Sequence, residues 1–244
     1  MNVAVLFAGG VGSRMHSKDL PKQFLEIHGK PIIVHTAELF QAHPDIDALV
    51  VASHPDWIEY CAGLFAKYGI DKVSAVVAGG KTGQLSIYAG LCAAEEVADG
   101  ERSIALIHDG VRPLITAQTI TDNIASVRMY GSAITSVKVK ETVLEVDSRE
   151  MITNMPSRAM SRLARAPQSF WLDEILTAHR RALSEGRTDF VDSASMMMEY
   201  GHALHLVEGP EENIKITTPD DFFSMRAILD VRENRQIYGL DEEG

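Results

Sequence analysis

Cysteine is almost absent from this sequence: Cys61 and Cys92 are its only two, and neither has a second cysteine or a histidine at a metal-binding spacing. A disulfide framework and a zinc knuckle are therefore excluded as the basis of the fold. Both thiols lie in stretches with helical spacing, so we expect them to be buried and inert. The nine histidines also lack HExxH or similar spacing, so a structural or surface role is expected for each.

Long apolar runs and a basic N-terminal segment are lacking too. No apolar stretch approaches the length that spans a membrane, and the strand-like run at residues 2–7 is followed at once by glycines. These features predict no membrane association and a reducing, cytoplasmic location. A basic surface is also missing, because 34 acidic and 23 basic residues give a formal net charge of −11. Nucleic-acid binding is thus not expected, whereas an anionic small substrate would need a local basic pocket.

Short, β-branched or apolar runs alternate with amphipathic stretches along the first half of the chain. The runs cover residues 3–7, 48–52, 73–77, 103–107 and 132–137, and the amphipathic stretches cover residues 32–41, 56–68, 84–97 and 119–130. Such alternation predicts βαβ units, and hence an α/β fold with a mostly parallel, twisted sheet flanked by helices. In such sheets ligands bind at the carboxyl ends of the strands, so functional residues are expected in the loops that follow.

The pattern changes after Val137. Residues 138–156 alternate polar and apolar side chains around a polar turn at residues 147–150, which predicts a β-hairpin or arm. An arm that is half apolar suits a dimer contact, although a hairpin folded onto its own sheet fits the same pattern.

Further elements are expected downstream: helices at residues 172–185, at 192–200 and from Pro219 onward, and a short strand at 213–217. No internal repeat or low-complexity linker interrupts them. We therefore predict a single domain over residues 1–235, followed by a frayed, polar tail at residues 236–244.

The first predicted strand runs into the glycine-rich sequence AGGVGSRM at residues 8–15. Glycines there allow positive φ and let backbone N–H groups approach a phosphate. Two common templates fail, since GxGxxG from Gly10 would need glycine or alanine at Met15, and a P-loop would need Gly-Lys-Ser/Thr. The loop is distinguished by its charge, because Arg14 and Lys22 can reach a triphosphate from two sides. The alternative is a tight strand-to-helix turn with two solvated cations.

Several motifs follow one another along the chain: AGGVGSRM at 8–15, PKQF at 21–24, paired glycines at 79–80 with Ser86, HDGVRP at 108–113, APQSF at 166–170 and NIKIT at 213–217. Together they resemble the IspD/TarI-type cytidylyltransferases, which make CDP-methylerythritol or CDP-ribitol. The resemblance spans nearly the whole chain. It implies a Rossmann-like nucleotidyltransferase fold with a projecting β-arm, and a homodimer formed through that arm.

The resemblance also implies a reaction, the transfer of CMP from CTP to the phosphate of a polyol phosphate with release of pyrophosphate. The valine before Arg112 and the PQSF sequence look closer to the ribitol-5-phosphate branch, so D-ribitol 5-phosphate is the expected acceptor. The alternative is 2-C-methyl-D-erythritol 4-phosphate. Gly110 in place of a usual alanine and Ala166 in place of a usual threonine depart from both branches. The acceptor, and with it a cell-envelope or an isoprenoid pathway, therefore stays open.

By the same resemblance, Arg14 and Lys22 hold the triphosphate and neutralise the charge that develops on it. No protein nucleophile or strong base is required, because a phosphate monoester with a second pKa of about 6 is mostly dianionic at neutral pH. Positioned cations and a magnesium ion should carry the catalysis. Backbone groups and one hydroxyl are expected to contact the nucleotide and read cytosine, at Ala8, Gly9, Gly10, Gly79, Gly80 and Ser86.

Asp109 comes at the carboxyl end of a predicted strand, where a carboxylate can hold Mg²⁺ and meet the ribose hydroxyls. A helix cap or a partner for Arg112 is the structural alternative, and Arg112 would then orient the loop or approach the ligand. The resemblance assigns Lys215 and Arg158 to the phosphate of the acceptor, with Thr142 assisting. Arg158 or Thr142 would come from the partner subunit. An exposed lysine at a sheet edge is the alternative for Lys215.

Two functions from other classes fit part of the pattern. A non-catalytic CTP-binding protein would keep the glycines, but it would not need both a triphosphate clamp and an acceptor clamp. A nicotinamide-dependent dehydrogenase is disfavoured by Met15 at the third glycine position.

Overall fold

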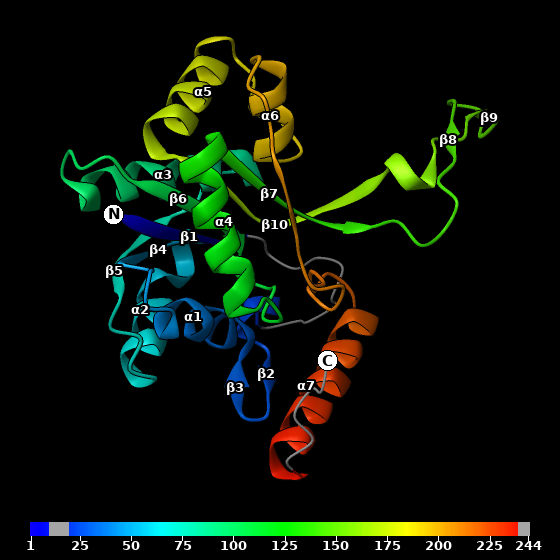
Figure 1. The fold of residues 1–244 in the computed structure, drawn as a ribbon. Coiled ribbons are helices and arrows are strands. Elements are labelled where there is room, and N and C mark those ends of the chain that lie inside the picture. Colours follow the sequence, from blue (N-terminus) through cyan, green and yellow to red (C-terminus); the bar gives the residue numbers. More distant parts are fainter. Residues whose placement is uncertain (10–19, 239–244) are drawn as a thin grey trace.

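The computed structural model of the chain describes residues 1–9 and 20–238 (Figure 1). Gly10 and Arg14, two of the predicted site residues, lie outside the described residues. The central element is a seven-stranded sheet with the order β11-β7-β10-β6-β1-β4-β5. Its strands are β1 (Asn2–Ala8), β4 (Ala48–Ser53), β5 (Val73–Ala78), β6 (Ile104–Asp109), β7 (Ser132–Lys138), β10 (Arg162–Trp171) and β11 (Leu206–Glu208).

Neighbouring strands of this sheet pair in parallel, except where β10 lies antiparallel to both β6 and β7. The predicted α/β class and the mostly parallel sheet are therefore confirmed. Each apolar run that was predicted as a strand forms a strand of the central sheet. These strands are β1, β4, β5, β6 and β7. Every residue of β4 and β6 is buried, which explains why these strands read as continuous apolar runs.

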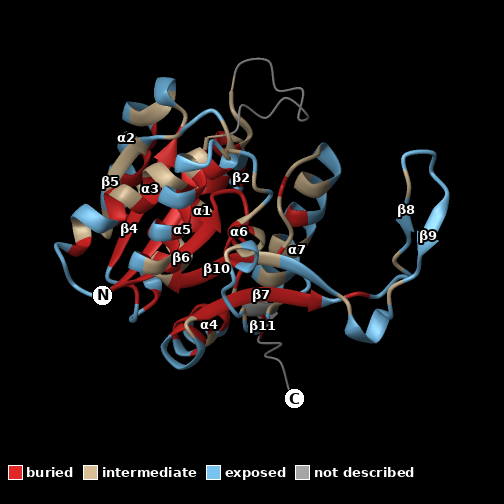
Figure 2. Cartoon of the chain, turned by 90° about the horizontal axis from the view of Figure 1, so that it is seen from above, coloured by how far each residue is buried: buried red, intermediate tan, exposed pale blue. Residues whose placement is uncertain are grey.

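Helices cover both faces of the sheet. They are α1 (Ile32–Ala42), α2 (Ile58–Lys67), α3 (Gly83–Ala98), α4 (Ala117–Tyr130), α5 (Leu172–Ser184) and α6 (Ser193–Glu199), whereas α7 (Pro219–Tyr238) lies apart from the sheet. Alternate residues of β1 point to opposite faces, because side chains along a strand have a period of two. Leu6 packs in a core cluster with α1, α2 and α4, whereas Val5 packs with α3, α5 and α6. Figure 2 shows these two buried layers on either side of the sheet.

Local residues explain where several helices begin. Thr82 accepts a hydrogen bond from the backbone N–H of Leu85 at 3.2 Å, and Thr116 accepts one from Thr119 at 3.2 Å. These N-caps satisfy donors that the first turn leaves without partners, and they start α3 and α4 directly after the loops that follow β5 and β6. The helix starts and the strand ends therefore lie at the same edge of the sheet. No helix of the described chain is long and apolar enough to cross a membrane.

Strand β10 was not predicted from the sequence. Its first half is largely exposed and its second half is buried, and Pro167 interrupts the ladder to β7. The buried half is fixed by Asn123 of α4, whose Oδ1 accepts from the Ser169 hydroxyl at 2.9 Å. The amide of the same asparagine donates to Thr135 Oγ1 of β7 at 2.9 Å. Because Ser169 and Asn123 are 46 residues apart, their contact produces no local sequence pattern from which β10 could be predicted.

The outer ends of β7 and β10 form an arm that projects from the body (Figures 1 and 2). The chain between them carries the small hairpin of β8 (Glu145–Val146) and β9 (Ile152–Asn154). At its turn the carboxylate of Asp147 accepts from the backbone N–H groups of Arg149 at 2.8 Å and Met151 at 3.0 Å. The predicted hairpin with its turn at residues 147–150 is therefore confirmed.

Three expectations need correction. Residues 213–217 are not a strand but an extended segment, whose Ile216 N–H donates to the carbonyl of Val111 at 3.0 Å. Residues 236–238, expected as the start of a frayed tail, belong to α7, which continues to Tyr238, and the rest of that tail lies outside the described residues. Cys61 is buried, and its burial raises its pKa to about 12, but Cys92 is only half-buried. Both thiols are free.

Two smaller elements complete the described fold. A short hairpin of β2 (Glu26–Ile27) and β3 (Lys30–Pro31) precedes α1, and its Ile27 packs in a third core cluster with Ile216 and Met225. Met225 belongs to α7, so this cluster holds the last helix against the β2–β3 hairpin and the segment that follows β6. Single 3₁₀ turns occur at η2 (Lys22–Phe24), η3 (Pro55–Trp57) and η4 (Arg158–Met160).

Candidate active site

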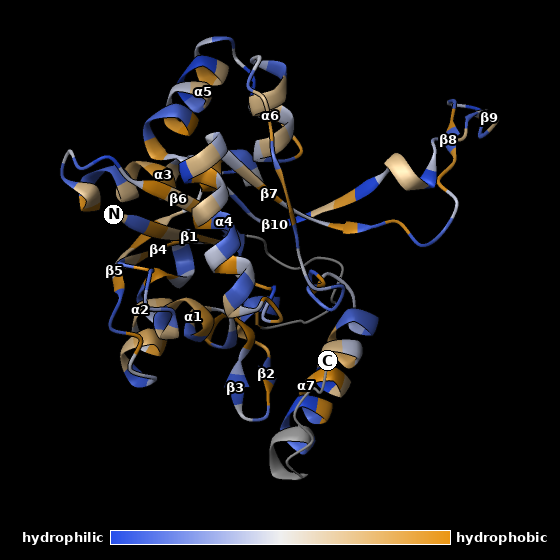
Figure 3. Ribbon diagram, in the orientation of Figure 1, coloured by the Kyte–Doolittle hydropathy of each residue, from blue (hydrophilic) through white to orange (hydrophobic). Residues whose placement is uncertain are grey.

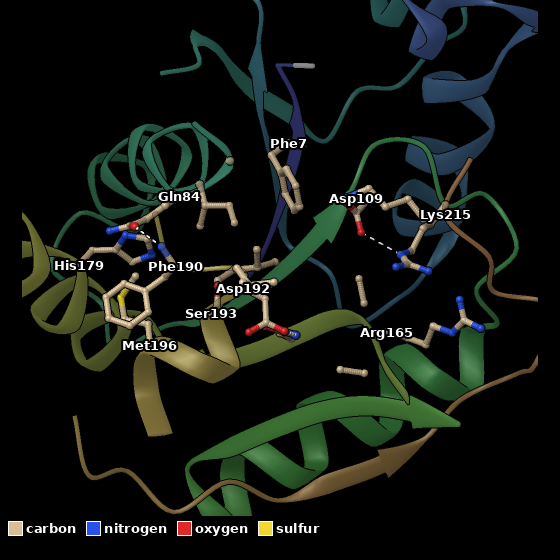
Figure 4. A pocket seen from close by; sticks show the side chains of 18 residues that line it. Phe7, Gln84, Asp109, Arg165, His179, Phe190, Asp192, Ser193, Met196 and Lys215 are labelled. Atoms are coloured by element: carbon tan, nitrogen blue, oxygen red, sulfur yellow. Dashed lines mark hydrogen bonds and ion pairs between the residues drawn. The ribbon is translucent and has the colours of Figure 1, made fainter. Parts of the chain in front are cut away.

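Two cavities open at the carboxyl ends of β1 and β6, the edge at which ligands were expected. The glycine-side cavity, of about 260 Å³, is lined by Ala8, Gly9, Lys22, Gln23, Gly80, Lys81, Thr82, Ser86 and Val111. The α6-side cavity, of about 250 Å³, is lined by residues of β10, α3, α5 and α6 (Figure 4). Phe7, Gly83, Asp109 and Lys215 line both, so the two cavities meet at these side chains.

Glycine is required in the glycine-side cavity for steric reasons. A Cβ atom at Gly9 would lie 3.0 Å from Ser86 Oγ, and one at Gly79 would lie 2.9 Å from the same oxygen. At Gly80 it would meet Leu85 Cβ at 2.3 Å. The hydroxyl of Ser86 donates to the carbonyls of Gly80 and Thr82, at 3.2 and 3.0 Å. The predicted residues around Ser86 therefore form one tightly packed wall, with Gly79 beside the residues that line the cavity.

Asp109 lies at the junction of the cavities and is held by two cations. Lys215 Nζ is 2.6 Å from Oδ1, and Arg112 Nε donates to Oδ2 at 2.8 Å. The carboxylate is 7% exposed. Burial alone raises the pKa of this carboxyl, but the charges and hydrogen bonds of Lys215 and Arg112 together lower the pKa below its usual value. Asp109 is therefore an anion at neutral pH. Arg112 is its ion-pair partner, which agrees with the structural alternative given above for Asp109.

Lys22 and Lys215 approach each other through the extended segment at residues 213–217. Lys22 Nζ donates to the carbonyl of Ile216 at 3.0 Å, and both lysines line the glycine-side cavity. Lys215 Nζ also lies 5.7 Å from the centre of the Phe7 ring. Its side chain is 40% exposed, so the ammonium is open to a ligand on the side away from Asp109. The structure thus brings together the predicted residues Lys22, Asp109 and Lys215.

Arg158 and Thr142 are not brought to Asp109 within one chain. Arg158 lies in η4 on the arm, where its Nη1 donates to the carbonyl of Lys140 at 3.1 Å. Thr142 lines an open hollow at the base of the arm, together with Arg165. Their assignment to the acceptor phosphate stays a prediction, and it requires a second chain.

Arg165 is a functional candidate that sequence reasoning missed. It lines both the hollow at the base of the arm and the α6-side cavity, and its Nε has no hydrogen-bond partner among the described residues. Burial and the nearby charge of Arg112 lower its pKa. A guanidinium in this setting is suited to an anion. The sequence feature that could have indicated Arg165 is its position directly before the APQSF motif.

The other missed residues of the α6-side cavity come from α3, α5 and the start of α6. Gln84 holds the loop between α5 and α6, because its amide donates to the carbonyl of Arg187 at 2.9 Å and accepts from the N–H of Phe190 at 3.0 Å. Asp192 caps α6 and accepts from Gln168 Nε2 at 2.9 Å. His179 of α5 also lines the cavity. No local sequence pattern distinguished Gln84 or His179, whereas Asp192 and Ser193 were recognisable as a helix cap that could also contact the acceptor.

A magnesium ion was predicted at Asp109. Among residues 1–9 and 20–238, no group of three or more histidine, cysteine or acidic side chains could hold a metal ion. Mg²⁺ is often bound by only one or two carboxylates together with the phosphates of a substrate. A single carboxylate at the junction of the two cavities fits an ion that is held largely by substrate.

Comparison with known proteins shows the family to which the chain belongs. Residues 2–231 match the family model of IspD, 2-C-methyl-D-erythritol 4-phosphate cytidylyltransferase. The chain is 54% identical over 240 residues to a ribitol-5-phosphate cytidylyltransferase of Streptococcus agalactiae, covering 98% of this chain and 100% of that protein. It is 39% identical to a 2-C-methyl-D-erythritol 4-phosphate cytidylyltransferase of Clostridium novyi, over 94% of this chain and 96% of that protein.

The fold has a counterpart among solved structures. The 4-diphosphocytidyl-2C-methyl-D-erythritol synthase of Anaerococcus prevotii superposes with a TM-score of 0.80 at 24% identity, covering 94% of this chain and 96% of that one. At this identity the likeness concerns the fold alone. The expected nucleotidyltransferase architecture is confirmed.

Two buried histidines beside the site predict how stability depends on pH. Burial is the main cause that lowers the pKa of both His108 and His179 from 6.5 to about 4. Between these values the unfolded chain binds protons that the folded chain does not, so stability falls as the pH decreases from about 6.5 to about 4. Each histidine should contribute a slope of roughly 1.4 kcal/mol per pH unit. Urea unfolding from pH 7 to pH 4.5 measures this slope.

In that measurement, His179→Leu should make the slope shallower by the contribution of one proton. The exposed His202 offers a control, since His202→Leu should leave the slope unchanged. An unchanged slope in His179→Leu would mean that His179 titrates alike in the folded and unfolded chains.

Proposed function

The chain belongs to the IspD family of cytidylyltransferases, and we propose that its acceptor is D-ribitol 5-phosphate, which receives CMP from CTP with release of pyrophosphate. The family and the full-length relatives make it a CTP-dependent nucleotidyltransferase. Support for the acceptor comes from the higher identity to a ribitol-5-phosphate cytidylyltransferase, 54% against 39% for the methylerythritol enzyme. The HDGVRP and PQSF sequences point to the same branch.

The junction of the two cavities at Asp109 and Lys215 is the observation that carries the proposal. A reaction that joins two phosphates needs two sites whose anionic ends meet. Nucleotide binding suits the glycine-side cavity, where backbone groups and Lys22 lie together. The acceptor phosphate suits the end of the α6-side cavity that holds Arg112 and Arg165, next to Lys215.

The chemistry follows from this arrangement. An oxygen of the acceptor phosphate attacks the α-phosphorus of CTP, and the bond from that phosphorus to pyrophosphate breaks. Lys22 and Lys215 stabilise the charge that develops on the phosphates, as positioned cations do in phosphoryl transfer. Arg14 is assigned to the same task by its motif alone. Asp109 keeps Lys215 and Arg112 in fixed positions.

Enzymes of this family generally depend on a divalent cation. Asp109 would hold Mg²⁺ together with the triphosphate, and the ion would supply further positive charge to the phosphates. Ala8, Gly9, Gly79, Gly80 and Ser86 are proposed to contact the nucleotide and leave room for cytosine rather than a purine.

A homodimer through the arm is part of the proposal. Val146 is 55% exposed, Met151 63% and Met160 85%, and Figure 3 shows hydrophobic residues along the arm. Exposed apolar side chains on a projecting arm favour a contact with a second copy. In such a dimer Arg158 and Thr142 would reach the acceptor phosphate of the partner subunit. A cytoplasmic location also stays a prediction.

The acceptor is testable with purified protein, CTP and Mg²⁺. Pyrophosphate release with D-ribitol 5-phosphate should have a kcat/KM at least about 10-fold above that with 2-C-methyl-D-erythritol 4-phosphate, because polar contacts to additional hydroxyls discriminate between acceptors. ATP in place of CTP is the control for the nucleotide. Preference for the methylerythritol substrate would replace the proposed acceptor by its alternative, and CTP binding without release would indicate a non-catalytic binder.

Lys215→Met tests the cation at the junction. We expect kcat/KM to fall by about 10²–10⁴, because a charge aimed at the reacting phosphates is lost. Thermal stability should fall as well, because the buried Asp109 loses one of its two cations, but Arg112 remains paired with it, so thermal melting verifies that the variant is folded at the assay temperature. Lys67→Met is the matched control, because Lys67 is exposed at the end of α2, lines neither cavity nor the hollow at the base of the arm, and should retain activity. An active Lys215→Met protein would exclude the assigned role.

Mixing two inactive variants tests whether Arg158 acts across the dimer. In a mixture of Arg158→Ala and Lys215→Met chains, half of the dimers are mixed at equilibrium, and each mixed dimer has one intact site of two. Activity should therefore recover to about a quarter of the wild-type value after subunit exchange. No recovery, with exchange verified by differently tagged chains, would place Arg158 in the site of its own chain or outside any site.

A further inference from the structure

The end of the α6-side cavity that lies away from Asp109 contains two deeply buried polar side chains. His179 is 1% exposed and Ser193 is 2% exposed, and both line the cavity. Neither ring nitrogen of His179, nor the Ser193 hydroxyl, has a hydrogen-bond partner among the described residues. Buried polar atoms without partners are uncommon because they lose their hydration, so each calls for a ligand or an ordered water.

The cavity is divided by charge. Figure 4 shows Asp109, Lys215 and Arg165 on one side of the view and His179, Phe190 and Met196 on the other. Arginine and lysine at the first end suit a phosphate. At the second end the described lining residue that could carry a positive charge is His179, and burial lowers its pKa to about 4, so its ring is neutral at neutral pH. A neutral imidazole offers one N–H donor and one acceptor nitrogen, a combination that matches a hydroxyl group.

The surroundings fix these two side chains in place. The ring of His179 stacks on Tyr88 with centroids 5.8 Å apart. Ser193 is the first residue of α6, and Asp192 just before it is held by Gln168 at 2.9 Å and by the N–H of Ser195 at 2.8 Å. Ile87, Ile107 and Met196 supply apolar walls between the polar groups. Such a lining suits a carbon chain that carries hydroxyls.

We propose that His179 and Ser193 bind the hydroxyl groups at the end of the acceptor remote from its phosphate, and that they select an acyclic polyol phosphate by the length of its chain. This inference rests on the proposed function, because it takes the acceptor to lie in the α6-side cavity. At one end of the cavity the phosphate is held by Arg112, Arg165 and Lys215. At the other end the last hydroxyls of the acceptor reach His179 and Ser193 only when the carbon chain is long enough. They are specificity-determining residues that take no part in the chemical step.

Two acceptors that differ in length separate this role from a structural one. D-Ribitol 5-phosphate reaches the far end, whereas D-erythritol 4-phosphate carries the same phosphate on a chain one carbon shorter. His179→Leu should lower kcat/KM for the ribitol compound by about 10- to 100-fold, mainly through KM. For the erythritol compound it should change kcat/KM by less than about 3-fold, and the KM for CTP should stay as in the wild type.

Ser193→Ala removes one oxygen and serves as a second variant that keeps the packing of the cavity. It should shift the preference in the same direction by a smaller factor, of about 3- to 10-fold. His202→Leu, at an exposed histidine, is the matched control and should leave both acceptors unaffected. Thermal melting of each variant verifies that it is folded.

Equal losses for both acceptors in His179→Leu and Ser193→Ala would overturn the inference, since they would indicate a structural role. Unchanged kinetics would overturn it as well, because ordered water would then satisfy these groups. Either result, with a wild type that is active on ribitol 5-phosphate, leaves the proposed function intact. A wild-type protein inactive with both acceptors would remove the proposed function and this inference together.

Discussion

The buried carboxylate of Asp109 between Lys215 and Arg112 is the interaction on which the rest of the site depends. A charge this deeply buried is stable only when it is paired and hydrogen-bonded, and here two cations do so at 2.6 and 2.8 Å. The chain of contacts continues, because Arg112 donates to the carbonyl of Asn213 at 2.8 Å, and the Asn213 amide donates to that of Ala166 at 2.7 Å. One network thus connects the end of β6 with the segment at 213–217 and with β10. Removing one member would leave a buried charge without its partner, so the network fixes where the two cavities meet.

The parallel part of the fold was accessible from the sequence because both faces of the sheet are covered. Under such cover a strand is apolar throughout, as in β4, and the amphipathic helices between the strands have their own period. Strand β10 followed neither rule. Part of it leaves the body for the arm, where its residues face solvent, and its buried part depends on Asn123 of a distant helix. Residues 213–217 resembled a strand for a similar reason, since they are extended but bond to a loop and a lysine instead of a ladder.

The residues of the site fall into the same two groups, those that the sequence pattern indicated and those that it did not. Lys22 follows β1 in a 3₁₀ turn and Asp109 is the last residue of β6, so the α/β pattern and the motifs together led to them. Arg165 and His179 come from elements that close the α6-side cavity only after the chain has folded. In the sequence, His179 is not set apart from the other residues on the apolar side of the amphipathic helix α5. What distinguishes it is that its buried ring nitrogens have no hydrogen-bond partner in the described part of the chain, and that is a property of the packed structure.

The start of α3 contributes to the walls of both cavities and so fixes their positions relative to each other. Gln84 anchors the loop between α5 and α6 through Arg187 and Phe190, and Ser86, one half-turn later, packs against the glycines of the other cavity. A single helix terminus therefore forms the wall of both sites. The reaction requires an oxygen of one substrate to lie in line with a phosphorus of the other, and a misplacement of about 1 Å can cost roughly 100-fold in rate. Because the start of α3 packs against both walls, the fold itself positions the two cavities that the proposed function assigns to the two substrates.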